Sequence, residues 1–332
     1  MPSPNRSHRA VSRAAMLLLS MLLLVTSCTK APAPTTAALE PGPVYDDAFW
    51  AHWGDGRGEL SAYDLVTPRY GAPRRGIAVA IFVTETFSNE DRVKADPGRH
   101  SKRDEFPVMK LNLIEDFATG IYDYHLLTSA FVTLAPVNSR AAGAPTKLSF
   151  SAQEWCGHTY AQMLFDHRYA RYTGHSYFDG EADSSSAFLV PANAQAEDAL
   201  MSWARGFAAP VVAAGDSAEV PVTGSLRIAR LTHQPLAIAP ARFRRSASPE
   251  RVTVPAGTFE ADVAGVTLAD GRAWTFWVER AAPHRIVRWS CSDGEHAELL
   301  GSDRLVYWEM NAPGGEAALA KLGLTPRPPR TP

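Results

Sequence analysis

Residues 154–183 contain the densest group of side chains in this sequence that can bind a metal ion or transfer a proton. Three histidines and several carboxylates fall within this segment. Imidazole and carboxylate groups suit zinc and other divalent ions, and a metal held by them activates water for hydrolysis. The candidate ligands are His158, His175 and Asp179. One functional hypothesis is therefore a metal-assisted hydrolase.

The same segment also has a purely structural interpretation. Its spacing matches no specific metal motif, and Asp179-Gly180 is typical of a hairpin turn. In a strand, His158 shares a face with Glu154, so the segment also fits the polar edge of a sheet. The sequence contains no Gly-x-Ser-x-Gly, P-loop, paired-cysteine zinc or His-Glu-x-x-His motif. We therefore predict no cofactor.

Tryptophan is the other residue type that could serve a binding site, and the chain has eight. On a curved sheet such side chains either fill the core or line a cavity. Trp274 and Trp277 point to opposite faces of a regular strand, because three residues separate them. Either both faces of that strand are covered, or one tryptophan is exposed. These two residues are the candidate ligand face.

The elements that position these residues follow from alternation with a period of two. Ile77–Val83 is apolar on both faces, as in a central strand. Met109, Leu111 and Leu113 alternate with polar residues, as in a half-buried strand. Further strands are expected through 120–134, 146–156, 168–178 and 220–230.

The C-terminal third predicts an antiparallel meander over residues 259–300. Asp270-Gly271 and Asp293-Gly294 each stand between alternating runs, which is a strong signal for a hairpin. Helical signal is sparse and is confined to 46–53, 194–207 and 315–322. The expected fold is mainly β: a curved antiparallel sheet or open barrel with a few short helices.

The N-terminus predicts secretion and a lipid anchor. A basic leader with three arginines precedes the apolar run Ala14–Val25, which is too short to span a bilayer comfortably. The run ends in Val-Thr-Ser-Cys28, which resembles a bacterial lipobox, where cleavage precedes a cysteine that carries diacylglycerol. The alternative is an ordinary signal peptide followed by an unrelated cysteine.

The expected organisation has four parts. Residues 1–27 form the signal peptide, and 28–43 form the lipidated cysteine with a tether rich in proline and alanine. Residues 44–323 form a single β-rich domain, and the proline-rich tail 324–332 is disordered. The membrane partner is reached through the lipid on Cys28. By the bacterial sorting pattern that this resembles, Thr29 favours the outer membrane over the inner one.

The net charge limits the classes of partner, and the cysteine content raises the question of a disulfide. A formal net charge of -2 argues against nucleic acid, which selects basic surfaces. Once Cys28 is lipidated, Cys156 and Cys291 remain in an oxidising compartment, where they could form a disulfide. Alternation places both on faces that look buried, so two buried free thiols are the alternative.

A family resemblance covers most of residues 45–324. Its motifs are Phe49-Trp50 with Trp53-Gly54-Asp55-Gly56, Tyr63-Asp64-Leu65, Glu154-Trp155-Cys156-Gly157-His158 and Tyr307-Trp308-Glu309-Met310-Asn311. These resemble a group of uncharacterised bacterial lipoproteins. Some members carry the label of septum-formation inhibitor, a family of cytoplasmic α/β nucleotide pyrophosphatases whose traits this chain does not share. Residues 254–259 are similar to a motif of periplasmic β-sheet proteins of unknown function. The resemblance implies a strongly curved antiparallel sheet and supplies no site residues.

Three functional hypotheses follow. The leading one is a membrane-anchored envelope lipoprotein, non-catalytic, that binds an apolar ligand or an envelope partner in the concavity of its sheet. The second is the metal-assisted hydrolase. The third is a structural or assembly component with no small ligand, which predicts an exposed apolar patch instead of a pocket.

Overall fold

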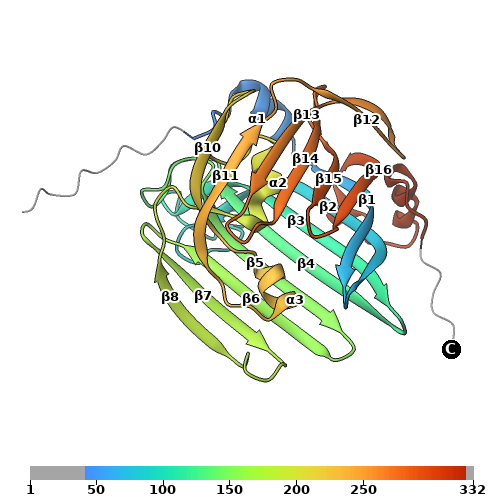
Figure 1. The fold of residues 1–332 in the computed structure, drawn as a ribbon. Helices are drawn as coiled ribbons and strands as arrows, with labels where there is room; N and C mark the ends of the chain where they lie inside the picture. The colour runs from blue at the N-terminus through green and yellow to red at the C-terminus, as the bar shows by residue number, and fades with distance from the viewer. Residues whose placement is uncertain (1–41, 327–332) are drawn as a thin grey trace, which may run out of the picture. The chain divides into compact units, whose positions relative to one another are not determined.

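The structure, a computed structural model, describes residues 42–326, which lie within one compact unit spanning Leu39–Pro332. The predicted signal peptide, Cys28, most of the tether and residues 327–332 of the tail lie outside the described residues. Strands dominate the described part, which confirms the mainly β class (Figure 1). Within that part, no helix is long and apolar enough to cross a membrane.

Sixteen strands of the described residues join in one sheet. The first eight form a meander in which each strand pairs antiparallel with the next. They are β1 (Gly58–Arg69), β2 (Ala72–Ser88), β3 (Glu105–Thr119), β4 (Tyr122–Thr133), β5 (Pro145–Glu154), β6 (Gly157–Phe165), β7 (Tyr169–Ser176) and β8 (Ser184–Leu189).

The later strands extend the sheet from the other side of β1. They are β9 (Gln195–Ala196), β10 (Ser217–Thr223), β11 (Ile238–Arg245), β12 (Glu250–Val254), β13 (Gly257–Thr267), β14 (Ala273–Glu279), β15 (Ile286–Cys291) and β16 (His296–Leu305). β16 pairs with β1, and the path then runs through β15, β14, β13, β11 and β10 to β9. The pair β9–β10 is parallel. Because β8 and β9 end the path, the sheet curls without closing.

The predicted C-terminal meander is confirmed. β13, β14, β15 and β16 pair antiparallel in sequence order. Gly271 and Gly294 lie in its turns with φ of 88° and 107°, a backbone region that glycine enters without steric cost. The two Asp-Gly signals therefore worked because the turns that they form need this conformation.

The helices are short. They are α1 (Asp47–Trp53), η1 (Glu197–Ala199), α2 (Leu200–Ala204), α3 (Leu226–Thr232), η2 (Tyr307–Glu309) and η3 (Gly315–Leu322). A helix was expected over 194–207, but helical turns cover only the middle of that range, in η1 and α2. The strand expected through 220–230 was wrong in its second half, because β10 ends at Thr223 and Ser225 caps the start of α3.

The up-and-down order of the strands gives the sheet two different ends. The turns β1–β2, β3–β4, β5–β6, β7–β8, β13–β14 and β15–β16 lie at one end, which we call the mouth, and α3 joins β10 to β11 there. The opposite end, which we call the far end, carries α1 and the loops 89–104 and 134–144. The predicted candidate residues 154–183 therefore lie mainly toward the mouth.

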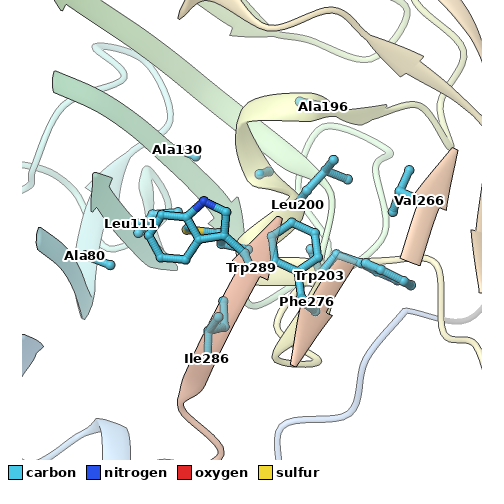
Figure 2. Close-up of a cluster of buried hydrophobic side chains, with 14 of the residues drawn as sticks. Ala80, Leu111, Ala130, Ala196, Leu200, Trp203, Val266, Phe276, Ile286 and Trp289 are labelled. Atoms are coloured by element: carbon cyan, nitrogen blue, oxygen red, sulfur yellow. The ribbon is translucent and has the colours of Figure 1, made fainter. Parts of the chain in front are cut away.

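The concave side of the sheet is filled by its own side chains. Trp203 from α2 and Trp289 from β15 are almost fully buried there, among alanine, leucine and phenylalanine side chains of both halves of the sheet (Figure 2). Trp203 contacts Phe243 edge-on, with ring centroids 4.8 Å apart. The interior of this sheet is thus a packed core.

Candidate binding site at the mouth of the sheet

The helix α3 lies across the mouth because the chain between β10 and β11 contains a strong helix start. Ser225 accepts a hydrogen bond from the Ile228 amide at 3.1 Å, which caps the first turn. Asp198, from η1, accepts the Leu226 amide at 2.9 Å and the Ser225 hydroxyl. His233 ends the helix in the left-handed conformation. Two segments far apart in sequence thus fix the first turn of α3.

A buried ion network holds the first half of α3. Arg227 donates to Glu115 on β3 at 2.7 Å and to Glu295 in the β15–β16 turn at 2.6 Å. Glu295 also accepts from the Trp289 indole at 3.2 Å and from the Thr67 hydroxyl at 3.2 Å. All three charged side chains are less than a tenth exposed. One arginine therefore links α3 to both halves of the sheet.

Burial changes the acidity of the carboxyl groups beneath α3. Burial raises the pKa of Asp198 to about 6, against the opposing effect of the Ser225 and Leu226 hydrogen bonds. The pKa of Glu115 is also raised, because burial and the neighbouring Glu295 charge outweigh the attraction of Arg227. The buried side chains that contact α3, which we call the seat of α3, therefore include two carboxyl groups that resist ionisation.

The second half of α3 is held more loosely. Arg230 donates one hydrogen bond to Glu154 at the end of β5, at 2.5 Å, and its guanidinium lies 3.8 Å above the Phe178 ring. Its Nε and Nη1 atoms are buried and have no hydrogen-bond partner within the described part of the chain. Arg69, from the end of β1, donates to the Leu231 carbonyl at 2.7 Å. Unpaired buried donors are costly, so this half is the weaker part of the seat.

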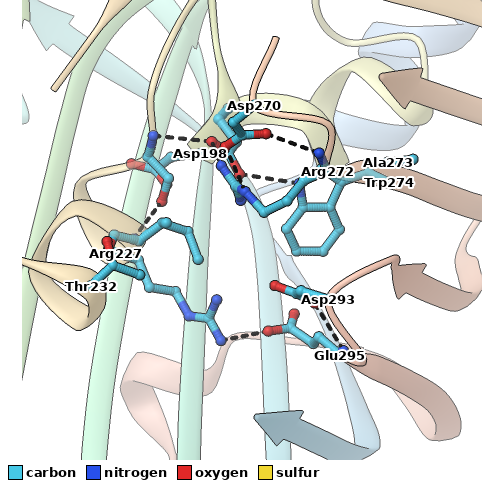
Figure 3. Close-up of polar contacts among 12 residues, drawn as sticks. Asp198, Arg227, Thr232, Asp270, Arg272, Ala273, Trp274, Asp293 and Glu295 are labelled. Carbon is cyan, nitrogen blue, oxygen red and sulfur yellow. Dashed lines mark hydrogen bonds and ion pairs between the residues drawn. The ribbon is translucent and has the colours of Figure 1, made fainter. Parts of the chain in front are cut away.

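A second charged cluster lies beside the first. Arg272 donates to both carboxylate oxygens of Glu197, at 2.5 and 2.9 Å, and the same carboxylate accepts from the Trp274 indole at 3.1 Å. Figure 3 shows Arg272 beside Asp270 and Trp274. Arg272 also donates to Asp270 at 2.8 Å. This cluster ties the β13–β14 turn to η1, next to the first turn of α3. Its charges are paired with one another and are not free to bind a ligand.

The hollow directly beneath α3 is small. Its volume is about 50 Å³, and its lining includes Leu111, Met201, Trp274, Phe276 and Arg227. A volume of this order holds one or two water molecules and no organic ligand. The deep concavity of the sheet is therefore not the place where this structure can accept an apolar molecule.

A larger groove opens between α3 and the strands β6 to β8. We call it the β8 groove. Its volume is about 430 Å³, within the range of ligand sites in proteins. Apolar lining comes from Phe150, Ala161, Tyr172, Phe188 and Leu236. The lining belongs to the concave face of β5–β8 that the rest of the sheet leaves uncovered.

Gly174 shapes the floor of the β8 groove. A Cβ atom at this position would lie 2.4 Å from the Tyr172 hydroxyl. The glycine thus lets the Tyr172 side chain lie along its own strand instead of standing in the groove.

A third hollow lies on the other side of α3. It has a volume of about 680 Å³ and runs between α3, the β1–β2 turn and the β13–β14 and β15–β16 turns. Its lining includes several of the paired charges described above, among them Arg227, Arg272 and Glu295. The two grooves differ in their walls: this one is bordered by the ion network of Arg227, whereas the β8 groove is bordered by the inner face of β5–β8.

The turns around the mouth expose large side chains. Tyr70, Ile121, Trp155 and Tyr177 lie in four neighbouring turns and are between 57% and 83% exposed. Trp155 stacks on Tyr122, with ring centroids 6.2 Å apart. Exposed aromatic residues gathered at one place mark a contact surface.

The predicted metal ligands do not form a cluster. His158, His175 and Asp179 are all exposed. His175 pairs with Asp183 at 3.0 Å and borders the β8 groove, whereas His158 does not line it. Within residues 42–326, no group of three or more histidine, cysteine or carboxylate side chains is arranged to hold a metal ion.

The candidate disulfide is absent, since Cys156 and Cys291 are both free. The expected burial of Cys156 was wrong, because β5 ends at Glu154 and Cys156 lies in the exposed β5–β6 turn. Cys291 is buried as expected, and burial raises the pKa of its thiol to about 12. In the order of the sheet, four strands separate the two hairpins that carry the cysteines.

The two candidate tryptophans point to opposite faces of β14, as predicted. Trp274 lies inside, where it lines the small hollow and binds Glu197. Trp277 lies on the outer face, where it donates to Glu250 at 2.8 Å and sits beside Arg288. Each is half-buried, so both faces of this strand are covered. The two residues do not form one ligand face.

Sequence reasoning missed the residues that build the mouth. Arg227 and Arg230 fall in a segment that was assigned to a strand, and arginine is not expected in a core. A signal was present: Ser225 precedes the run Leu-Arg-Ile-Ala-Arg-Leu, in which an N-cap residue is followed by good helix formers.

Comparisons with known proteins give little beyond the fold. No protein-family model matches the chain, and no curated protein matches it. Among solved structures, a beta-barrel-like protein of a domain of unknown function, DUF1849, from Brucella abortus is similar in structure. The TM-score is 0.43 at 10% sequence identity, over 75% of this chain and 98% of that one.

Proposed function

We propose that this protein is a non-catalytic binding protein of the cell envelope. It is held in the outer membrane by a lipid on Cys28, and it takes the apolar part of a ligand or envelope partner into the β8 groove. The observation that carries the proposal is the groove itself: about 430 Å³, apolar in much of its lining, and open beside a short helix.

The packed interior argues against a ligand site in the concavity of the sheet. A ligand in the concavity would have to displace Trp203 and Trp289, whose burial makes a large contribution to the core. The β8 groove needs no such displacement. We therefore propose the site at the mouth instead of in the concavity, because the sheet leaves part of its inner face uncovered there.

The exposed residues of the turns favour the second kind of occupant in this proposal, which is a protein partner. A partner that reaches the β8 groove from the mouth would pass the β5–β6 and β7–β8 turns, which expose Trp155 and Tyr177. Aromatic residues at such positions commonly dominate the energy of an interface. The hydrolase hypothesis gains no comparable support, because its candidate ligands are exposed and do not converge.

Native mass spectrometry of residues 29–332, secreted to the periplasm and kept free of detergent, tests the proposal. The matched variants are Ala161→Phe, which fills the groove, and Ala187→Phe, which places the same side chain on the outer face of β8. We expect a co-purifying apolar molecule or peptide that Ala161→Phe removes and Ala187→Phe retains. A ligand retained equally by both variants would contradict the proposal.

A further inference from the structure

The strand β8 is an edge that nothing covers within residues 42–326. It ends the order of the sheet and pairs only with β7. Edge strands in soluble proteins usually carry a charge, a proline or a bulge that prevents another strand from pairing with them. The sequence Ser-Ser-Ser-Ala-Phe-Leu of β8 has no charge and no proline, and its register with β7 is regular.

The register shows which backbone groups are available. The Val190 amide donates to the Arg168 carbonyl at 2.9 Å, so this pair is hydrogen-bonded. Because hydrogen-bonded pairs alternate along an antiparallel ladder, the amides and carbonyls of Ser185, Ala187 and Leu189 point away from β7. Three donors and three acceptors thus face outward along one straight edge.

The side chains of β8 point alternately to the β8 groove and to the outer face of the sheet. Ser186 and Phe188 line the β8 groove, whereas Ala187 and Leu189 are exposed on the outer face. A strand added to β8 would therefore place every second side chain over the groove, opposite Ser186 and Phe188. The edge and the groove form one continuous surface.

Charges of opposite sign flank the two ends of this edge. The β7–β8 turn at the mouth carries Asp179, Glu181 and Asp183. At the other end of β8, the β6–β7 turn carries the exposed Arg168. A strand of about six residues separates the two ends by roughly 20 Å. A segment that complements both ends has a basic residue near the mouth and an acidic residue near Arg168.

We propose that β8 binds an extended peptide segment of a protein partner by strand addition. The segment alternates apolar residues toward the β8 groove and carries a basic and an acidic residue at its two ends. This inference rests on the proposed function, and it names the class of occupant that the groove takes. Backbone hydrogen bonds supply affinity in this mode, and alternate side chains supply specificity.

The test uses the full chain in phospholipid nanodiscs and a labelled peptide, acetyl-Glu-Val-Thr-Val-Thr-Val-Lys-amide, with binding followed by fluorescence anisotropy. In antiparallel addition its lysine lies at the acidic turn, its valines face the groove, and its threonine amides pair with β8. We expect saturable binding. A peptide N-methylated at both threonines should bind at least tenfold more weakly, since it keeps the side chains and loses the paired amides.

The matched protein variants are Ala187→Pro and Ala187→Ser. Proline removes an outward amide that β7 does not use, whereas serine keeps it. We expect Ala187→Pro to abolish peptide binding and Ala187→Ser to retain it. Equal binding of the peptide and its N-methylated form would overturn the inference, and it does so even if Ala187→Pro fails to fold.

The outcome separates the inference from the proposed function. If the peptide fails to bind while native mass spectrometry finds an apolar ligand that Ala161→Phe removes, strand addition is wrong and the groove function stands. If neither is found, both fail. Pairing of β8 with β8 of a second copy, seen as a dimer that Ala187→Pro dissolves and the peptide does not, would also overturn the assignment to a peptide partner.

Discussion

Two buried arginine clusters at opposite ends of the sheet differ in how completely their hydrogen bonds are satisfied. At the far end, Arg205 donates to both oxygens of Glu59, at 2.5 and 3.0 Å, and to the carbonyls of Pro283 and His284. Its guanidinium lies 4.5 Å from the centre of the Phe82 ring. The Arg205 and Glu59 side chains are each 1% exposed.

At the mouth the corresponding pairs are incomplete. Arg227 Nε approaches Glu115 Oε2 to 2.7 Å without the angles of a hydrogen bond. Arg230 leaves two buried donors without partners in the described part of the chain. A fully satisfied buried pair makes one arrangement unique, whereas a partly satisfied one leaves alternatives close in energy. We infer that the Arg205–Glu59 pair is the more rigid of the two clusters and that the arginines of α3 can rearrange when a ligand binds.

Removing the far-end carboxylate should have the largest effect. Glu59→Ala leaves Arg205 buried without its partner, so we expect the free energy of unfolding to fall by about 3–5 kcal/mol. Urea denaturation measures the loss. The control is Asp64→Ala in the same strand, whose carboxylate pairs with Arg75 at the surface and should cost less than about 1 kcal/mol. A loss of that small size for Glu59→Ala would mean that the far end is no more rigid than the surface.

Removing the central arginine of the mouth should cost less, because a carboxyl group can accept a proton in its place. For Arg227→Met we expect a loss of about 2–3 kcal/mol at pH 7.5, below the usual range for a broken buried pair. Glu115 and Glu295 then lie together without a cation. The variant should therefore regain stability as the pH falls toward 5, as measured by thermal unfolding at several pH values. Stability that does not depend on pH would contradict this account of the mouth.

Asp198 should give the wild-type protein a smaller pH dependence of known sign. Its pKa is about 6 in the folded protein, against 3.8 for the unperturbed group, so the folded state holds the proton more tightly. The stabilising contribution is complete below about pH 4 and is lost as the pH rises through 6, by about 1–3 kcal/mol. Asp198→Asn, which keeps the shape, should remove this part. An unchanged profile would show that the first turn of α3 is not held as we describe.

The two cysteines should show the smallest effect and a clear contrast in reactivity. In folded protein spanning residues 29–332, a thiol reagent should label Cys156 and leave Cys291 unlabelled until the chain unfolds, because only Cys156 is exposed. Mass spectrometry of digested protein measures the labelling. Cys156→Ser should change stability by less than about 0.5 kcal/mol. A disulfide between them would instead show as two unreactive cysteines and a mass lower by two hydrogens.

The sequence predicted the strands, the hairpin turns and the start of α1 better than the contacts that hold α3. Alternation and the Asp-Gly turns located the strands, because a period of two and a turn with positive φ are local properties of the backbone. The start of α1 was equally local, since Asp46 caps the helix by accepting the Phe49 amide at 2.9 Å. Such features need no knowledge of the tertiary structure.

The contacts that hold α3 at the mouth could not be predicted in the same way. Arg227 contacts Glu115 and Glu295, which are 112 and 68 residues away in the chain, so no local pattern joins them. The segment 154–183 drew attention because it is rich in histidine and carboxylate. In the structure its value lies elsewhere: it provides one wall of the β8 groove and the acidic turn before β8. Residue types drew attention to residues 154–183, but only the register of the strands shows which of their side chains lie along the β8 groove.

Hydrogen exchange, measured with and without the heptapeptide, tests the central claim most directly. In the free protein we expect the amides of α3 to exchange faster than those of α2, because the arginines of α3 are less completely hydrogen-bonded than Arg205, which follows α2. With peptide bound, protection should rise at Ser185, Ala187, Leu189 and along α3, and should not change near Arg205. Slow exchange of α3 in the free protein, or protection that appears only outside the β8 groove, would contradict the account.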